Sequence, residues 1–172
     1  MNADDLRALQ APLKDKYREA PEAALITLTA RGEIDAEGVA CRVDTGKALI
    51  EAGLHPATGG AGALACSGNM LLDALVACAG VTLRAVATAI GFDLESGVVS
   101  AEGDLDFRGT LGVAKDAPVG FRDIRLTFDL KTSEPRERID QLIKLTERYC
   151  VVYQTLAKPA RLGLTVKTAG EQ

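Results

Sequence analysis

The chain has 172 residues, of which 47% are hydrophobic and 26% charged, and its net charge is −4. This size and composition predict a single globular protein with a sizeable core. The acidic balance argues against nucleic acid or an anionic membrane as the main partner, and the polar residues 1–20 do not resemble a signal peptide, so we expect a cytoplasmic protein.

A helix followed by two strands is predicted for the first part of the chain. Residues 3–19 carry apolar side chains at helical spacing, which indicates an amphipathic helix. Strands are predicted at 23–30 and 39–44, with a turn region at 31–38 between them. The Gly-rich stretch 55–69 predicts a flexible connection to the next element.

The run from about Met70 to Ile90 is apolar on nearly every side, which predicts a helix in the centre of the protein. Asp73 and Arg84 interrupt this run, so a buried helix is favoured over a membrane span. Gly91 follows directly and suits the C-terminal cap of the helix.

The second half predicts two more strands, a long helix and a last strand. Residues 97–107 and 121–131 fit strands, and the second of these alternates apolar with polar residues, as in a sheet with one solvent-exposed face. The long helix is expected to begin with Ser133 as its N-cap and to end before Pro159. The alternation in 161–168 predicts the last strand.

This order of elements predicts an α+β domain in which antiparallel sheets cover two central helices. The first half of the chain offers little apolar surface to bury its own central helix. An intertwined homodimer would bury it, and we therefore expect one.

Four cysteines and one histidine limit the chemistry of the chain. None of Cys41, Cys66, Cys78 and Cys150 forms a C-x-x-C pair, and the histidine is His55. A structural zinc site would need closely spaced ligand pairs, and no export signal supports a secreted disulfide framework. We expect free thiols or one redox pair, with no metal and no cofactor.

Cys78 lies on the predicted central helix, and Cys150 lies on the apolar face of the second long helix. Asp73 and Arg84 share a different face of the central helix, so neither can serve the Cys78 thiol from within it. Free cysteine is among the most buried residue types, which favours an inert core thiol. If the two helices pack together, however, the two thiols could meet, and the spacing alone leaves both interpretations open.

Three stretches together resemble the OsmC/Ohr family of thiol-dependent hydroperoxide reductases. They are 65-ACSGNMLLDALVACAGVTLRAVATAIGFDL-94, 101-AEGDLDFRGTLG-112 and 143-IKLTERYCVVYQTLAKP-159. The resemblance runs from about residue 23 to residue 168. The predicted first helix lies outside the common core, so we expect a helical extension at 1–20 and an OsmC-like domain at 21–172.

The resemblance implies a swapped α+β homodimer with its active sites at the subunit interface, and a peroxidase cycle on two cysteines. Cys78 would be the peroxidatic nucleophile that becomes a sulfenic acid, and Cys150 would resolve it into a disulfide. The implied substrate is an organic hydroperoxide, and the implied reductant is a lipoyl-type dithiol.

Such a nucleophile requires a nearby cation, because burial raises the pKa of a thiol. In the family an arginine after the first strand provides the charge, held by a glutamate that precedes the first cysteine. Arg31 is the best positional match for this arginine, with Arg42 in reserve.

The chain departs from the family at two positions near the cysteines. Gly68 and Asn69 stand where the glutamate is expected, and Val151 replaces a proline after the second cysteine. Glu147 could substitute for the glutamate or be a surface charge. These departures keep a second interpretation open, in which the same fold is a binding or redox-sensing module that holds a small apolar ligand. We expect His55 to be exposed and idle, and Cys41 and Cys66 to be structural or incidental.

Overall fold

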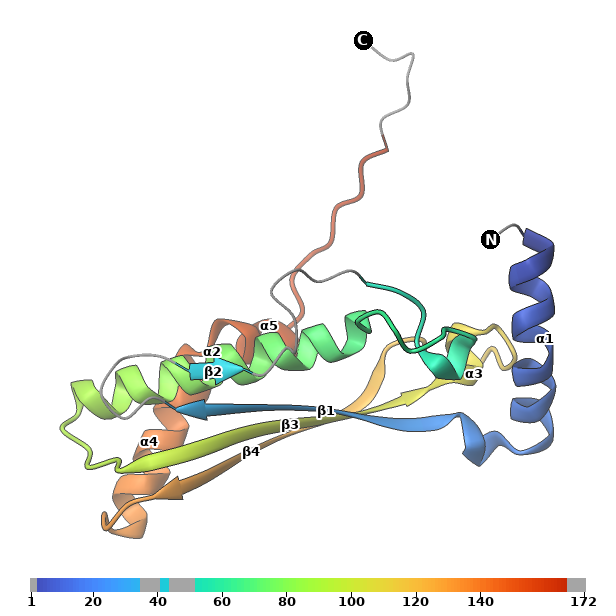
Figure 1. Ribbon diagram of the computed structural model, residues 1–172. Helices are drawn as coiled ribbons and strands as arrows, with labels where there is room; N and C mark the ends of the chain where they lie inside the picture. The colour runs from blue at the N-terminus through green and yellow to red at the C-terminus, as the bar shows by residue number, and fades with distance from the viewer. Residues whose placement is uncertain (1–2, 35–40, 44–51, 167–172) are drawn as a thin grey trace.

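The computed structural model describes residues 3–34, 41–43 and 52–166; side chains are described at 8–27, 33 and 52–166. Four antiparallel strands form one sheet in the order β2-β1-β3-β4 (Figure 1). Their bounds are β1 Leu25–Ile34, β2 Cys41–Val43, β3 Ser96–Asp106 and β4 Phe121–Lys131. The alternation over 121–131 thus predicted β4 to the residue.

One face of this sheet is apolar and the other polar, as the alternation of β4 predicts. Leu126 and Phe128 pack against the core, whereas Arg125 is exposed and pairs with the Asp104 carboxylate of β3. The Arg125 guanidinium, together with the Thr27 hydroxyl, lowers the pKa of Asp104 to about 2. The polar face is therefore held together by hydrogen-bonded ion pairs in contact with solvent.

The central helix, α2, spans Ser67–Ala89 and packs along the apolar face of the sheet against β1 and β3. Leu72, Val76 and Leu83 on its inner side are fully buried. Gly91 adopts a φ of 61° just after the helix, which confirms its predicted place in the cap. By length and composition α2 could also cross a membrane, and 39% of its most apolar stretch is buried within the chain.

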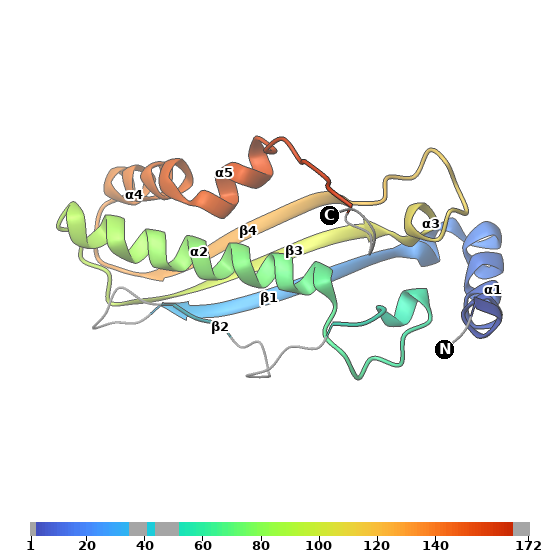
Figure 2. The same ribbon diagram turned by 90° about the horizontal axis from the view of Figure 1, so that it is seen from above.

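The second long helix is in fact two helices, α4 (Arg136–Tyr149) and α5 (Val151–Ala157), which lie along α2 on the side away from β2 (Figure 2). The prediction of one continuous helix was wrong because Cys150 is extended, with φ −71° and ψ 109°. The predicted N-cap, Ser133, was also wrong: Pro135 occupies that position, with no hydrogen bond from a capping side chain. The Glu134 side chain just before it accepts from the Asp93 N–H and from Arg138.

The first helix, α1 (Ala3–Glu19), stands at one end of the sheet and confirms the predicted range (Figure 1). It packs against three short helices: the 3-10 helices η1 (Pro21–Ala24) and η2 (Pro56–Thr58), and α3 (Phe107–Thr110). The hydroxyl of the buried Tyr17 donates to the Ala57 carbonyl, and the Gln10 amide donates to that of Thr58. These bonds fix α1 to the segment that leads into α2.

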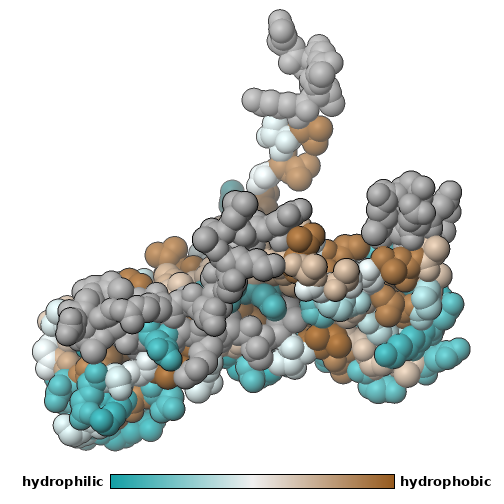
Figure 3. Space-filling model, in the orientation of Figure 1, coloured by the Kyte–Doolittle hydropathy of each residue, from teal (hydrophilic) through white to brown (hydrophobic). Residues whose placement is uncertain are grey.

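Two other expectations differ from the structure, and a third concerns a second copy of the chain. Residues 31–34 belong to β1 instead of a turn, because their pairing with β3 continues to Glu33. Within the described residues of this one chain there is a single sheet with helices on one face, in an α+β arrangement, and the wrapping of sheets around two helices in an intertwined homodimer stays a prediction. Residues 161–166 form no strand and run away from the body, with Leu162 96% and Leu164 90% exposed (Figure 3).

Candidate active site

The structure brings together the two cysteines that the sequence singles out. Cys78 lies in the middle of α2, and Cys150 lies at the junction of α4 and α5, which packs against that helix. Both are free thiols; Cys78 is partly exposed and Cys150 is 1% exposed. Their side chains are hydrogen-bonded to each other, with the Cys150 thiol donating to the Cys78 sulfur.

The surroundings of Cys78 favour its thiolate. Burial alone would raise the pKa of Cys78, but hydrogen bonds to the sulfur outweigh this effect and lower the pKa below its ordinary value. The donors are, in decreasing order of effect, the Val152 N–H, the Cys150 thiol, the Thr82 hydroxyl and the Val151 N–H. Cys78 is therefore the better nucleophile of the pair.

Cys150 has the opposite character. Burial raises the pKa of Cys150 to about 11, although the Tyr153 N–H donates to its sulfur at 3.5 Å. Donation to Cys78 raises it further, because a thiol that donates its proton to an anion holds that proton more tightly. The pair thus divides into one ionisable sulfur and one that stays protonated.

The break at Cys150 explains how backbone groups reach these sulfurs. The first N–H groups of a helix have no partner within the helix. Because Cys150 is extended and α5 begins at Val151, these free donors lie beside the two sulfurs. The short helix therefore supplies hydrogen bonds that a continuous helix would have used internally.

The structure describes the backbone of Arg31, the arginine predicted to activate Cys78, but not its side chain. The backbone of Arg31 pairs with Ser100 in the β1–β3 ladder, and that of Arg42 in β2 pairs with Glu33. The side chains of both arginines lie outside the described residues, so their proposed contact with Cys78 stays a prediction. Within the described part of the chain, the groups that lower the pKa of Cys78 are all hydrogen-bond donors, and no cation is among them.

The structure also shows where the positions that depart from the family pattern lie. Asn69 is in the first turn of α2, where its Oδ1 is buried with no hydrogen-bond partner among the described residues. Glu147 lines a nearby cavity and is not among the groups that shift the pKa of Cys78 or of Cys150. Arg84 is directed to the Leu94 carbonyl, which agrees with the expectation that it does not serve Cys78.

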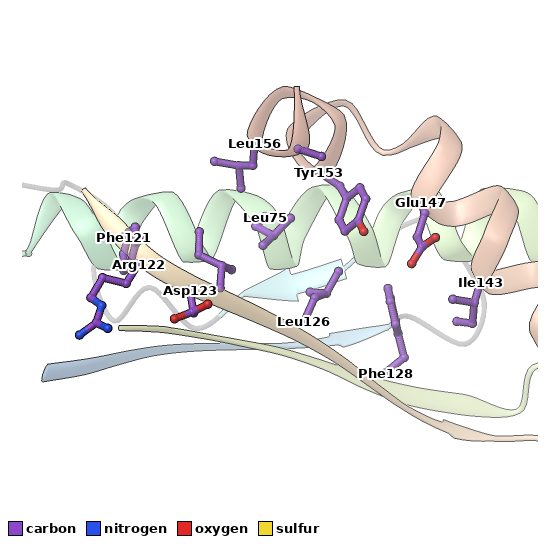
Figure 4. Close-up of a pocket in the computed structure, with 12 residues that line it drawn as sticks. Leu75, Phe121, Arg122, Asp123, Leu126, Phe128, Ile143, Glu147, Tyr153 and Leu156 are labelled. Carbon is purple, nitrogen blue, oxygen red and sulfur yellow. The ribbon is translucent and has the colours of Figure 1, made fainter. Parts of the chain in front are cut away.

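This cavity has a volume of about 480 Å³ and lies between β4, α2 and the α4–α5 pair (Figure 4). Leu126 and Phe128 of β4 face it from one side, and Leu75 of α2 from the other. Tyr153, Glu147, Arg122 and Asp123 add polar or charged groups, and the other lining residues are apolar. Leu75 is three residues before Cys78 and Tyr153 three after Cys150, so the cavity lies about one helical turn from each cysteine, although neither cysteine lines it.

The remaining candidates have structural roles or lie elsewhere. His55, which we expected to be exposed, is half-buried: its ring stacks on Phe107 at 5.0 Å, and its Nδ1 accepts from the Ala57 N–H. Burial lowers its pKa. Cys66 precedes α2 as its N-cap, and the side chain of Cys41 lies outside the described residues. No group of three or more potential metal ligands occurs in the described part of the chain.

Sequence reasoning found both cysteines but missed what surrounds them. Thr82 was recognisable as a neighbour of Cys78, one helical turn away, but its hydroxyl gives no signal of its own. Backbone donors such as the Val152 N–H carry no sequence signal at all. Only the loss of a proline at Val151 indicated that an N–H group would be present there.

Comparison with known proteins supports the family resemblance of the sequence. The model of the OsmC-like protein family matches residues 60–165, which is more than half of the chain. No curated protein matches the sequence. A crystal structure of an OsmC-like hydroperoxide resistance protein from Jannaschia sp. CCS1 is similar, with a TM-score of 0.64 and 18% identity over 86% of this chain and 97% of that one.

At that identity the structural similarity shows the fold alone, whereas the family model shows descent. The division into an extension at 1–20 and a domain at 21–172 stays a prediction. The chain belongs to the OsmC-like protein family.

Proposed function

We propose that the chain is a thiol-dependent peroxidase that reduces organic hydroperoxides. The Cys78 thiolate attacks the O–O bond, so that an alcohol leaves and Cys78 becomes a sulfenic acid. The Cys150 sulfur then attacks the Cys78 sulfur, water leaves, and a Cys78–Cys150 disulfide forms. A dithiol reductant of lipoyl type returns both residues to thiols.

The observation that carries the proposal is the unequal, hydrogen-bonded pair of thiols. Cys78 has the lowered pKa that a nucleophile needs, and Cys150 lies within hydrogen-bonding contact of it, ready to resolve a sulfenic acid. The apolar cavity beside the pair supports an organic hydroperoxide rather than hydrogen peroxide as substrate. The Arg31 side chain would add positive charge at this site, as the family resemblance implies.

A coupled assay tests the proposal. Cumene hydroperoxide is mixed with dihydrolipoamide and the wild-type protein, Cys78→Ser or Cys150→Ser. We expect catalytic turnover only with the wild type, and one equivalent of sulfenic acid on Cys78 in Cys150→Ser, detectable by dimedone labelling and mass spectrometry. Equal peroxide consumption by the wild type and Cys78→Ser would rule the proposal out.

We also propose that the working unit is a homodimer in the cytoplasm. The free thiols support a reducing compartment. Leu71 and Val81, each 38% exposed, flank Cys78 on the outer side of α2, and the extended segment 161–166 exposes Leu162 and Leu164. A second copy would bury both surfaces and place Cys78 at the subunit contact.

Sedimentation velocity tests the dimer. We expect a dimer for the wild type and a shift toward monomer for Leu162→Asp/Leu164→Asp, because two charges would have to be buried at the contact. Lys158→Asp, just before the segment and at an exposed position, is the control and should leave the dimer intact. A monomeric wild type would contradict the proposal.

The cavity favours a second candidate function, the binding of a small apolar ligand without turnover. Its volume of about 480 Å³ lies within the range of small-molecule sites, and most of its lining is apolar. Native mass spectrometry of the purified protein would support this function if it shows a bound ligand while the peroxidase assay is negative. Leu75→Trp would fill the cavity and should abolish that binding.

A further inference from the structure

The chain has one histidine, His55, and the proposed peroxide reaction does not use it. His55 precedes the 3-10 helix η2 and caps it, because its Nδ1 accepts from the Ala57 N–H at 3.0 Å. Its backbone carbonyl accepts from the Thr58 N–H, from the Thr58 hydroxyl and from the Gly60 N–H. The conformation of η2 therefore depends on both the side chain and the backbone of His55.

The first helix, α1, is bound to two carbonyl groups of η2. The Tyr17 hydroxyl donates to the Ala57 carbonyl at 2.8 Å, and the Gln10 amide donates to the Thr58 carbonyl at 3.2 Å. Both acceptors belong to a helix of three residues, so a change at its N-terminal cap displaces both. Helix α1 also contacts α3, on which the His55 ring stacks through Phe107 (Figure 1). The position of α1 thus depends on the cap that His55 provides.

The hydrogen bond from Ala57 determines the protonation state of the His55 ring. A backbone N–H only donates, so Nδ1 must be unprotonated and the ring must be neutral. A proton on Nδ1 would place two N–H groups against each other and remove the cap. The stacking on Phe107, at 5.0 Å between ring centres, also keeps the ring half-buried, where a positive charge is costly.

The charged groups around His55 do not favour its protonation. On α3, the buried Asp106 carboxylate is already paired with Arg108 at 2.6 Å. On α1, Lys14 lies on the same face as Tyr17, three residues away, and adds a positive charge to the side that meets η2. Helix η2 itself carries no titratable side chain. Among the described residues burial is the effect that shifts the pKa of His55, and it lowers that pKa.

We propose that His55 is a pH-sensitive latch that keeps α1 docked on η2 only while its ring is neutral. The ring binds a proton more tightly when α1 is undocked, since His55 then has the ordinary histidine pKa of about 6.5. Docking is therefore strongest above about pH 6.5 and weakens as the pH falls from there through the lowered pKa of the docked state. The Ala57 N–H then loses its acceptor, and the two carbonyls that bind α1 shift.

Hydrogen exchange of the full-length protein tests the latch. Helix α1 contains Pro12, and isolated helices have little stability in water, so undocking should expose its amides to exchange. Amides of α1 from Gln10 to Glu19 are followed at pH 7.0 and pH 5.0 by mass spectrometry, with correction for the intrinsic pH dependence. We expect their protection to fall severalfold at pH 5.0, while amides of β3 and β4 keep theirs. Among ordinary side chains, histidine alone titrates between these pH values.

Two substitutions of His55 separate its charge from its cap. His55→Asn supplies a neutral oxygen that accepts well at an N-cap, so α1 should stay docked at both pH values. His55→Ala has no acceptor and should lower the protection of α1 at both. The latch is overturned if the wild type shows no loss at pH 5.0, if His55→Asn shows the same loss, or if β3 and β4 lose as much protection as α1.

A titration by NMR gives an independent measurement, because the one histidine makes its Cε1–H signal unambiguous. The wild type should titrate with a pKa below about 6.5. Tyr17→Ala removes a buried anchor of α1 and should raise this pKa toward 6.5, since docking and protonation oppose each other. A wild-type pKa at or above about 6.5, or no rise in Tyr17→Ala, would overturn the latch even if the His55 variants fail to fold. Neither measurement involves the cysteines, so a failure here leaves the proposed function intact.

Discussion

Two places where α2 meets the α4–α5 pair use hydrogen bonds in opposite ways. At the C-terminal end of α2, the Arg138 guanidinium of α4 donates to the carbonyls of Ile90 and Gly91, and it also lies over the Phe92 ring. In the middle of α2, the N–H groups of α5 are directed at the sulfur of Cys78. In the first contact the Arg138 cation binds the carbonyl groups at the negative end of α2. In the second, neutral N–H donors are positioned to stabilise the Cys78 thiolate.

The difference between these two contacts indicates which part of the interface can change when the cysteines react. Arg138 pairs with the Glu134 carboxylate and also donates to the carbonyls of Ile90 and Gly91, so this end of the interface is fixed. The donors around Cys78 lower its pKa, and a disulfide to Cys150 would change the contacts of both sulfurs. We therefore expect substitutions at the first contact to change stability and substitutions at the second to change thiol reactivity.

The largest expected effect concerns the two thiols themselves. At pH 7 iodoacetamide should modify Cys78 at least about 100-fold faster than Cys150, since a thiol with a pKa of about 11 has almost no thiolate at that pH. Because the pKa of Cys78 is lowered, its reactivity should also persist to lower pH than that of an ordinary cysteine. Peptide mapping after timed alkylation measures both rates, and comparable rates would contradict the assignment of nucleophile.

The second effect is on stability. Arg138→Met keeps a long apolar stem but removes the hydrogen bonds to Ile90 and Gly91, and should cost about 2 kcal/mol in free energy of unfolding. Arg136→Met is the matched control in the same helix: Arg136 is 84% exposed and, among the described residues, pairs with Asp140 alone, so the loss should stay below about 0.5 kcal/mol. Urea denaturation measures both, and equal losses would show that the Arg138 contacts do not hold this interface.

The same comparison shows what the sequence could predict. The apolar run of α2, the Gly91 cap and the alternation of β4 follow from local patterns, and all three are confirmed. The packing of Cys78 against Cys150 follows from the expectation that two central helices must touch. These features depend on which faces of the helices and strands are apolar, and a single sequence shows this directly.

The predictions that failed depend on backbone hydrogen bonds, which the pattern of apolar and polar side chains does not encode. The apolar face of 136–157 is continuous, so nothing in it predicts the break at Cys150. The pattern of 161–168 predicts a strand, but a strand needs a neighbour to complete its hydrogen bonds, and residues 161–166 have none among the residues that the structure describes. The donors to Cys78 are mostly backbone groups, which every residue except proline provides.

A substitution at Val151 tests whether a backbone N–H group lowers the pKa of Cys78. Val151→Pro removes one N–H donor to Cys78 but should preserve α5, because proline is well tolerated at the first position of a helix. The preceding Cys150 is already extended, as a residue before proline prefers to be. The Val151 side chain is 71% exposed, so its replacement should not disturb the core.

The loss of about 1 kcal/mol of hydrogen bonding to the thiolate should slow alkylation of Cys78 at pH 7 by about fivefold. The pKa of Cys78 should rise accordingly, since one of the contacts that lower it is gone. Val151→Ala keeps the N–H and is the control; it should react like the wild type. If alanine and proline slow the reaction equally, the side chain matters instead of the donor, and the contrast between the two contacts on α2 loses its physical basis.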